Sequence, residues 1–215
     1  MMDSDLYRIR FSPRELTAAR SFWRPIAKHL QRYIPPNGTV LDLGAGFCHF
    51  INNIQAARKI ALDFNAANLA AHADAGVEQV AGDGADLSAL PPLDTVFASN
   101  VFEHFQSRED VYRSFQGVFS RLRSGGRFIV LQPNFAYCAR EYFDFFDHRL
   151  IFTHKSMSEG LEAAGFAVET VIPRFLPFTS KNGIPKAPWL VALYLRVPLA
   201  WKVMGGQMLL VARKP

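Results

Sequence analysis

The chain has 215 residues, of which 49% are hydrophobic and 20% are charged, and its formal net charge is +5. This is an ordinary globular balance, and the length predicts a single domain, residues 1–215. The lysines and arginines are scattered rather than gathered into a stripe, so the excess charge indicates a solubilising surface and no nucleic-acid partner.

The cysteines and the first residues bear on location. Cys48 and Cys138 form no C-x-x-C spacing, so no metal site is expected. A free, reduced pair suits the cytoplasm. Residues 1–5 contain no apolar signal core and do not indicate export. We therefore expect a cytoplasmic protein.

A first helix is predicted from Pro13 to Tyr33, where apolar residues recur at helical spacing. Ser12 and Glu15 have the spacing of a capping box, and proline suits the first helical position. The segment 35–38, Pro-Pro-Asn-Gly, ends the helix and turns the chain into the first strand.

The most informative segment is Thr39–Phe47, in which an apolar run ends in two glycines, Gly44 and Gly46. It predicts a buried strand, a tight turn and a helix that follows from Cys48. Bare backbone at such a turn lets a nucleotide-like cofactor approach closely. A dinucleotide fingerprint would need glycine at His49, and its absence weakens that alternative.

Strands and helices then alternate as far as Leu131, which is the signature of a parallel sheet with helices on both faces. A helix is predicted over residues 107–123, with an acidic first turn after Ser107. The strand-like runs end at Asp63, at Gly82-Asp83-Gly84, at Ser99-Asn100 and, after the glycine pair 125–126, at Leu131.

The last third predicts a helix over residues 156–164 and strands over 167–174 and 207–213, which form a final antiparallel pair. Residues 176–206 between these strands are apolar and too many for a hairpin loop. Three interpretations are open: a helix pair packed on the domain edge, a homodimer contact, or a peripheral membrane patch within residues 184–204. The membrane patch would use Trp189, Arg196, Trp201 and Lys202.

Five of these segments, in this order, resemble those of class I S-adenosylmethionine-dependent methyltransferases of the small-molecule type. They are Asp42-Leu43-Gly44-Ala45-Gly46, the run ending at Asp63, Gly82-Asp83-Gly84, the segment 94–105 with its D-x-V-x-x-S-N-V-x-E-H pattern, and residues 122–131. The family's frequent third glycine falls at Cys48, where this chain departs from the pattern. The resemblance implies an α/β, Rossmann-like, doubly wound sheet of seven mostly parallel strands with an antiparallel last strand.

Within that fold, the resemblance divides the domain into an N-terminal helical cap (1–37), a core (38–175), an apolar insert (176–206) and a last strand (207–215). The first helix either packs on the sheet or forms a lid over the cofactor, as N-terminal helices often do in this family. The polar contacts of such a lid would be Tyr7, Arg8 and Arg10.

The resemblance also implies S-adenosyl-L-methionine as the cofactor. The glycine loop would approach its methionine part, Asp63 would hold the ribose, and Asp83 would flank the adenine. Asp42 would bond loop amides or the cofactor's ammonium, and a helix N-cap is the alternative for Asp63. The cofactor-binding residues expected are Asp42, Gly44, Ala45, Gly46, Asp63, Phe64, Asp83, Gly84 and Asn100.

Methyl transfer needs an acceptor in line with the methyl group, and a hydroxyl acceptor benefits from a general base. The two candidates are His148, which Asp147 could orient, and His104, which otherwise is only a helix-start residue. Nearby aromatics could line an apolar acceptor site or fill the core under a long loop, and Arg140 and Arg149 could hold an anionic acceptor. The aromatics are Phe135, Tyr137, Tyr142, Phe143, Phe145 and Phe146.

The acceptor is expected to be a small molecule, methylated on an oxygen or nitrogen atom. The motifs of DNA methyltransferases are missing after the fourth strand and at Cys138. The tail resembles, more loosely, bacterial methyltransferases found beside sugar and polysaccharide biosynthesis. Two alternatives of other classes stay open: a non-catalytic S-adenosylmethionine-binding module acting through a partner, and a nicotinamide-dependent oxidoreductase.

Overall fold

The computed structural model describes residue 9, residues 12–178 and residues 187–215, and its centre is one seven-stranded sheet. The strand order is β3-β2-β1-β4-β5-β7-β6. The strands are β1 (Thr39–Leu43), β2 (Arg58–Asp63), β3 (Val77–Ala81), β4 (Leu93–Ser99), β5 (Leu122–Pro133), β6 (Ala167–Leu176) and β7 (Gln207–Arg213).

The first five strands pair in parallel, and β7 runs antiparallel to both β5 and β6, between which it lies. The predicted mostly parallel sheet, with its antiparallel last strand, is therefore confirmed. The order places β1 and β4 side by side, with Leu43 opposite Ala98. At this point the chain's direction of winding reverses, which is where open α/β sheets bind ligands.

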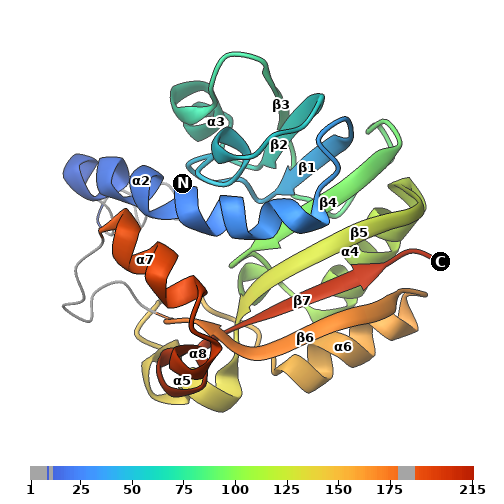
Figure 1. Cartoon of the computed structure of the whole chain (residues 1–215). Helices are drawn as coiled ribbons and strands as arrows, with labels where there is room; N and C mark the ends of the chain where they lie inside the picture. The colour runs from blue at the N-terminus through green and yellow to red at the C-terminus, as the bar shows by residue number, and fades with distance from the viewer. Residues whose placement is uncertain (1–8, 10–11, 179–186) are drawn as a thin grey trace.

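Helices cover both faces of the sheet (Figure 1). They are α2 (Pro13–Leu30), α3 (Ala66–His72), α4 (Arg108–Arg121), α5 (Phe135–Tyr142), α6 (His154–Ala163), α7 (Pro188–Leu195) and α8 (Pro198–Met204). The described part of the chain also contains three short 3₁₀ turns: η1 (Gln31–Tyr33), η2 (Ile51–Asn53) and η3 (Phe102–His104).

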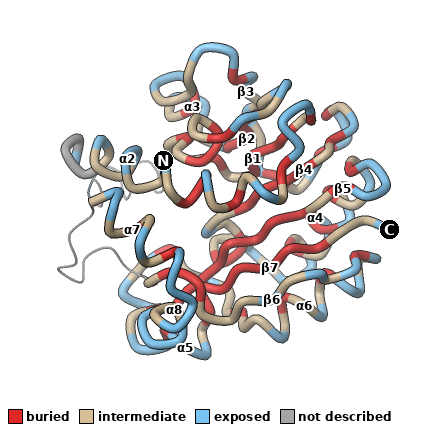
Figure 2. The backbone as a smooth tube through the Cα atoms, viewed as in Figure 1, coloured by how far each residue is buried: buried red, intermediate tan, exposed pale blue. Residues whose placement is uncertain are grey.

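Alternate residues of the buried strands supply two cores, one on each face. In β5, Phe128 and Val130 join the core under α4 and α6, whereas Ile129 and Leu131 join the core under α2 and α7. Figure 2 shows the central strands as the buried part of the chain, with exposure concentrated on the helices and loops around them. The resulting three layers hold the strand ends at fixed positions.

The N-terminal helix packs on the sheet. Ile26, Ala27 and Leu30 of α2 are fully buried in the core that also contains Phe97 and Ile129. This burial shows that α2 packs on the sheet. The residues of the lid interpretation, Tyr7, Arg8 and Arg10, lie outside the described residues.

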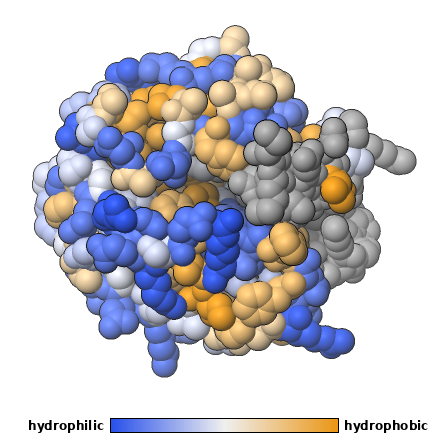
Figure 3. Space-filling model, turned by 180° about the vertical axis from the view of Figure 1, so that it is seen from behind, coloured by the Kyte–Doolittle hydropathy of each residue, from blue (hydrophilic) through white to orange (hydrophobic). Residues whose placement is uncertain are grey.

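The insert contains a helix pair, α7 and α8. Val191 and Leu195 of α7 are buried in the α2 core. Trp201 of α8 turns inward, because its indole Nε1 donates to the Tyr194 carbonyl at 2.9 Å and its ring meets Phe175. No helix among the described residues is long and apolar enough to cross a membrane. The opposite face of the molecule, seen in Figure 3, is largely hydrophilic with small apolar areas.

Two local predictions were wrong. The expected helix from Cys48 is a series of turns that ends in η2, because Cys48 has a left-handed φ of 57° that no helix accommodates. The helix predicted to Arg123 ends at Arg121, and Leu122 already pairs with Leu93 of β4. Tertiary strand pairing overrides helical periodicity at this end.

Candidate active site

The glycine loop after β1 is anchored to the end of β2. The backbone N–H groups of Gly44 and Ala45 both donate to the Leu62 carbonyl, at 2.8 and 2.9 Å. Gly44 has a φ of 69°, and a Cβ built on it would lie 2.5 Å from Cγ2 of Val101. Only glycine therefore lets the β1 loop meet the segment that follows β4.

Gly46 faces a different environment from Gly44. Its φ is 50°, and a Cβ built on it meets no atom within 4 Å. The backbone at Gly46 thus borders open space at the carboxyl end of β1. A cradle of this kind, lined by bare backbone, is what a closely approaching cofactor requires.

Asp63, the last residue of β2, ties this loop to the next helix. Its Oδ2 accepts from the Gly46 N–H at 2.8 Å, and its Oδ1 accepts from the Asn65 N–H at 2.9 Å. Burial raises the pKa of Asp63, and these two backbone hydrogen bonds oppose the shift. The N-cap of α3 is Asn65, whose side chain accepts from Asn68, so Asp63 is not the helix cap.

Asp42 is the last but one residue of β1, just before the glycine loop, and is buried. Burial raises the pKa of Asp42 to about 8; a hydrogen bond from the Ile51 backbone opposes this shift, and the charge of Asp63 adds to it. The free protein at neutral pH therefore holds Asp42 largely protonated. A cation placed beside it would favour the ionised form.

The remaining predicted cofactor residues lie at neighbouring strand ends. Phe64 is exposed directly after Asp63, and Asp83 is exposed after β3, where its Oδ1 accepts from the Ala85 N–H at 2.9 Å. Gly84 has a φ of 76°, and a Cβ there would lie 2.8 Å from Leu43 Cδ1. Asn100 follows β4 with a φ of 52°, a strained conformation that asparagine tolerates better than most residues.

Beside Asn100, the structure brings together three side chains from two distant segments. Glu103 and His104 belong to η3, and His148 comes from the loop after α5. Glu103 Oε1 lies 3.9 Å from His104 Nε2 and 4.0 Å from His148 Nε2, and the two imidazole rings are 5.2 Å apart. These three residues are called the Glu-His-His cluster below.

The cluster is held by a second set of contacts. Gln132 Nε2 donates to Glu103 Oε2 at 2.5 Å, while Glu103 Oε1 has no hydrogen-bond partner among the described residues. Burial raises the pKa of Glu103, and His104 and Gln132 oppose the shift. His104 Nδ1 lies 3.1 Å from the Asp147 carbonyl and 3.5 Å from its Oδ2. A carbonyl only accepts, so Nδ1 is the donor in this contact, and Nε2 is the ring nitrogen nearer to Glu103.

Sequence reasoning missed Glu103 and Gln132. The sequence indicated the Glu-His pair only as a motif and Asp147 as a residue that could orient His148. The structure shows that Asp147 also contacts His104. The useful signal was the position of a glutamate directly after Val101 and Phe102 at a buried strand end, where an ionisable side chain needs partners.

The predicted aromatic residues have mixed environments. Tyr142 is buried, and its hydroxyl donates to the Leu150 carbonyl. Phe145 stacks on His148 with ring centroids 5.0 Å apart. Tyr137, Phe143 and Phe146 are exposed. The aromatics therefore both support the His148 loop and leave apolar rings at its surface.

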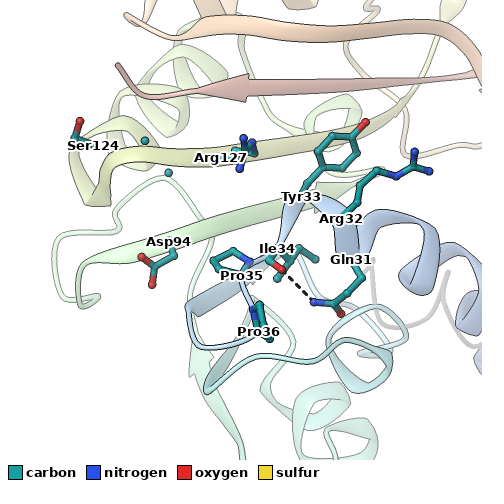
Figure 4. A pocket seen from close by; sticks show the side chains of 11 residues that line it. Gln31, Arg32, Tyr33, Ile34, Pro35, Pro36, Asp94, Ser124 and Arg127 are labelled. Atoms are coloured by element: carbon teal, nitrogen blue, oxygen red, sulfur yellow. Dashed lines mark hydrogen bonds between the residues drawn. The ribbon is translucent and has the colours of Figure 1, made fainter.

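A separate cavity of about 540 Å³ lies at the other edge of the sheet (Figure 4). Asp94, near the amino end of β4, and Arg127 of β5 line it together with residues 31–36. Asp94 Oδ2 accepts from the Thr39 N–H at 2.8 Å and from Arg123 at 2.7 Å. These contacts close the amino ends of the strands, away from the glycine loop.

Comparison with known proteins relates the core of the chain to one family. Residues 41–130 match the model of a family described as a methyltransferase domain. At the level of sequence, no curated protein matches the chain significantly.

Solved structures share the fold across nearly the whole chain. A methyltransferase of Thermotoga maritima has a TM-score of 0.67 at 14% identity, covering 98% of this chain and 99% of its own. One from Archaeoglobus fulgidus has a TM-score of 0.63 at 18% identity, covering 88% and 93%. A Haloferax volcanii chain, solved with the methyltransferase activator Trm112, has a TM-score of 0.66 at 18% identity, covering 90% of both chains. At these identities the likeness shows the fold.

Proposed function

We propose that the chain is an S-adenosylmethionine-dependent methyltransferase of the class I fold and that it methylates a small-molecule acceptor bound beside the Glu-His-His cluster. The methyltransferase-domain model that residues 41–130 match, together with the order of the sheet, supports this enzyme class and S-adenosylmethionine as the cofactor. We further propose where the cofactor and the acceptor bind and how the acceptor loses its proton.

The open backbone at Gly46 carries the cofactor assignment. We place the methionine part of the cofactor over residues 44–46, its ribose at Asp63, and its adenine between Phe64 and the Asp83–Gly84 turn. The side-chain oxygens of Asp63 already accept two backbone hydrogen bonds. Each carboxylate oxygen has a second lone pair, which leaves capacity for ribose hydroxyls.

When bound, the cofactor supplies a methyl group already activated on a sulfonium. The chain's own contribution is then to position the acceptor and to promote loss of its proton. The His104 side chain is 29% exposed, whereas the His148 side chain is 5% exposed. We propose that both histidines, together with Glu103, promote loss of the acceptor's proton.

The surroundings of the cluster favour an acceptor with apolar and anionic parts. Phe143 and Phe146 expose aromatic rings on the His148 loop, and Arg140 and Arg149 are exposed close by in sequence. Rings of this kind bind apolar groups, and guanidinium groups bind carboxylates or phosphates. Sugar- and lipid-linked hydroxyl compounds therefore belong in the acceptor screen.

The proposal is tested first by calorimetric titration with S-adenosylmethionine, S-adenosylhomocysteine and NAD. We expect micromolar binding of the first two, weakened at least tenfold in Asp63→Ala and unchanged in Glu159→Ala, a surface change of the same charge. Binding of NAD alone would overturn the assignment. Cofactor binding without turnover of any acceptor would favour a non-catalytic binding module.

Turnover with an identified acceptor tests the cluster separately. We expect His148→Ala and His104→Ala to lower kcat far more than they weaken cofactor binding. An unchanged kcat in both variants would remove the histidines from the mechanism.

We also propose the domain organisation, a contact surface and a location. Residues 1–215 form one domain, in which 1–37 are the cap, 38–175 the core, 176–206 the insert and 207–215 the last strand. The exposed face of α7 and α8 contacts a membrane surface or a second copy of the chain. A cytoplasmic location is supported by Cys48 and Cys138, which are buried and unbridged.

A further inference from the structure

We propose that the Glu-His-His cluster binds a divalent transition-metal cation, with zinc the best match, and that this cation coordinates a hydroxyl of the acceptor. The inference rests on the proposed function and deepens it, because it selects oxygen as the methylated atom. It also replaces the expectation, drawn from cysteine spacing, that the chain has no metal site.

The ligand atoms are close to a coordinating arrangement. One atom from each of Glu103, His104 and His148 can be chosen so that all three lie within 4.8 Å of one another. In the tetrahedral geometry of zinc, metal–ligand bonds near 2.1 Å place neighbouring ligand atoms roughly 3.4 Å apart. The two observed separations of 3.9 and 4.0 Å from Glu103 Oε1 need to shrink only slightly. Small side-chain rotations achieve this.

The carboxylate is the strongest sign of a missing partner. Glu103 is fully buried, and only its Oε2 is satisfied, by Gln132. Its Oε1 has no hydrogen-bond partner among the described residues and lies between the two imidazoles. A buried carboxylate oxygen without a partner is costly, and a cation at this point would remove that cost.

The contacts of His104 are those of a metal-binding imidazole. Metal-binding histidines usually donate their second ring N–H to a carboxylate or a carbonyl, which fixes the tautomer. His104 Nδ1 meets both kinds of group on Asp147 and presents Nε2 to Glu103. The backbone N–H groups of Arg149 and Leu150 donate to the Glu103 carbonyl at 2.8 and 3.1 Å. These bonds fasten the His148 loop to η3.

The composition of the cluster identifies the cation and its role. Two imidazoles with one carboxylate form a three-ligand set that zinc enzymes use when the fourth position must stay open to water or substrate. The His104 side chain is 29% exposed, so the cluster has a side that an acceptor can reach. Glu103 and His104 follow Asn100 by three and four residues, which keeps the cation beside the proposed methyl donor.

The cation would act on the acceptor's hydroxyl. Coordination lowers the pKa of a bound hydroxyl, so its proton passes to water before transfer. The hydroxyl oxygen then forms a bond to the methyl carbon as the carbon–sulfur bond of the cofactor breaks, and S-adenosylhomocysteine leaves. The histidines serve as ligands in this step, and the cation takes over the role of the general base.

Metal binding by the full-length chain tests the inference without any acceptor. After treatment with a chelator, the protein is titrated with Zn²⁺ by calorimetry and with Co²⁺ by visible absorption. We expect one ion per chain, with affinity reduced at least tenfold in Glu103→Gln and in His148→Ala. His154→Ala, a histidine change outside the cluster, should leave the affinity unchanged.

Folding and cofactor binding are followed in the same variants. Glu103→Gln keeps the size and burial of the side chain, so its circular dichroism and S-adenosylhomocysteine affinity should match the unmodified chain. Equal metal affinity in the unmodified chain, Glu103→Gln and His148→Ala would overturn the inference. If the unmodified chain binds metal but does not bind S-adenosylhomocysteine, the proposed function would be overturned instead.

Discussion

Two glycines of the loop after β1 are needed for different reasons: Gly44 for its tight fit against Val101, and Gly46 for access of the cofactor to the backbone. In Gly44→Ala, the new Cβ would clash with Val101 in addition to requiring a left-handed φ. We expect the free energy of unfolding to fall by about 3 kcal/mol, from backbone strain and overpacking together. Urea denaturation measures this loss.

Gly46→Ala has only the backbone strain, because its Cβ would enter open space. We expect a loss of about 1 kcal/mol in stability but at least tenfold weaker binding of S-adenosylhomocysteine. Calorimetry and urea denaturation on the same protein separate the two effects. Normal cofactor affinity in Gly46→Ala would show that the cofactor binds elsewhere.

We expect cofactor binding to be coupled to the release of a proton from Asp42. Its pKa of about 8 in the free protein keeps a proton on the carboxyl at pH 7. A cofactor ammonium beside Asp42 would lower that pKa, so binding at pH 7 releases up to one proton. Above about pH 9 the free carboxyl is already ionised, and the release disappears.

The proton release is measured by calorimetry in two buffers with different ionisation enthalpies. Asp42→Asn, which cannot titrate, should bind without it. If the unmodified chain releases no proton at pH 7, then Asp42 bonds only the loop amides and not the cofactor.

At the scale of elements, the segment between α5 and α6 decides where His148 lies. The Tyr142 hydroxyl, buried at the end of α5, donates to the Leu150 carbonyl and holds the loop against η3. In Tyr142→Phe this carbonyl loses its partner, and we expect about 1–2 kcal/mol lower stability. The loop should also loosen, so Zn²⁺ affinity falls while S-adenosylhomocysteine affinity does not change.

Tyr112→Phe is the matched control for this prediction. The Tyr112 hydroxyl of α4 likewise donates to a carbonyl, that of Ala163 at the end of α6. It should leave both affinities unchanged. Equal metal affinity in the two variants would show that the Tyr142 bond does not position His148.

Strands were predicted more successfully than the site for a physical reason. Apolar runs such as residues 93–99 are buried on both faces, and burial alone determines them. Their carboxyl ends then locate Asp63 and Asn100 without any knowledge of long-range contacts. The left-handed φ of Cys48 has no corresponding pattern in the sequence. It depends on the hydrogen bonds of the loop, in which the Cys48 N–H donates to the Ala45 carbonyl and the Cys48 carbonyl accepts from the Asn52 N–H.

The Glu-His-His cluster could not be predicted for the opposite reason. Glu103 and His148 are 45 residues apart in sequence, and no periodicity links them. Their proximity depends on the loop after α5 folding back onto η3. Only the short Glu-His pair and the histidine-containing loop were visible in the sequence, each compatible with a surface turn.

On the scale of the whole molecule, one exposed apolar surface is on other elements than the proposed chemistry. The proposed cofactor and acceptor sites gather at the carboxyl ends of β1, β2, β3 and β4. This apolar surface is on the helix pair α7 and α8, whose outer residues are large and exposed. These are Trp189, Leu193, Val197, Leu199, Val203 and Met204. The separation allows the surface to be altered without touching the reaction.

Charge favours an anionic membrane surface as the partner of this face. Arg196 and Lys202 are exposed among the apolar side chains, which is the composition of a helix lying in a lipid interface. We expect the chain to sediment with vesicles that contain phosphatidylserine, and to do so less as salt screens the charges. Trp201 does not contribute, because its indole is bonded to Tyr194 within the protein.

The double variant Trp189→Ser, Leu199→Ser should stay in the supernatant while binding S-adenosylhomocysteine normally, because α7 keeps Val191 and Leu195 in the core. Val171→Ser on β6, another exposed apolar residue, is the control and should sediment like the unmodified chain. If the unmodified chain ignores anionic vesicles but forms a dimer that the double variant abolishes, then the face is a contact between two copies. Such a dimer would bury the apolar side chains that a membrane would otherwise cover.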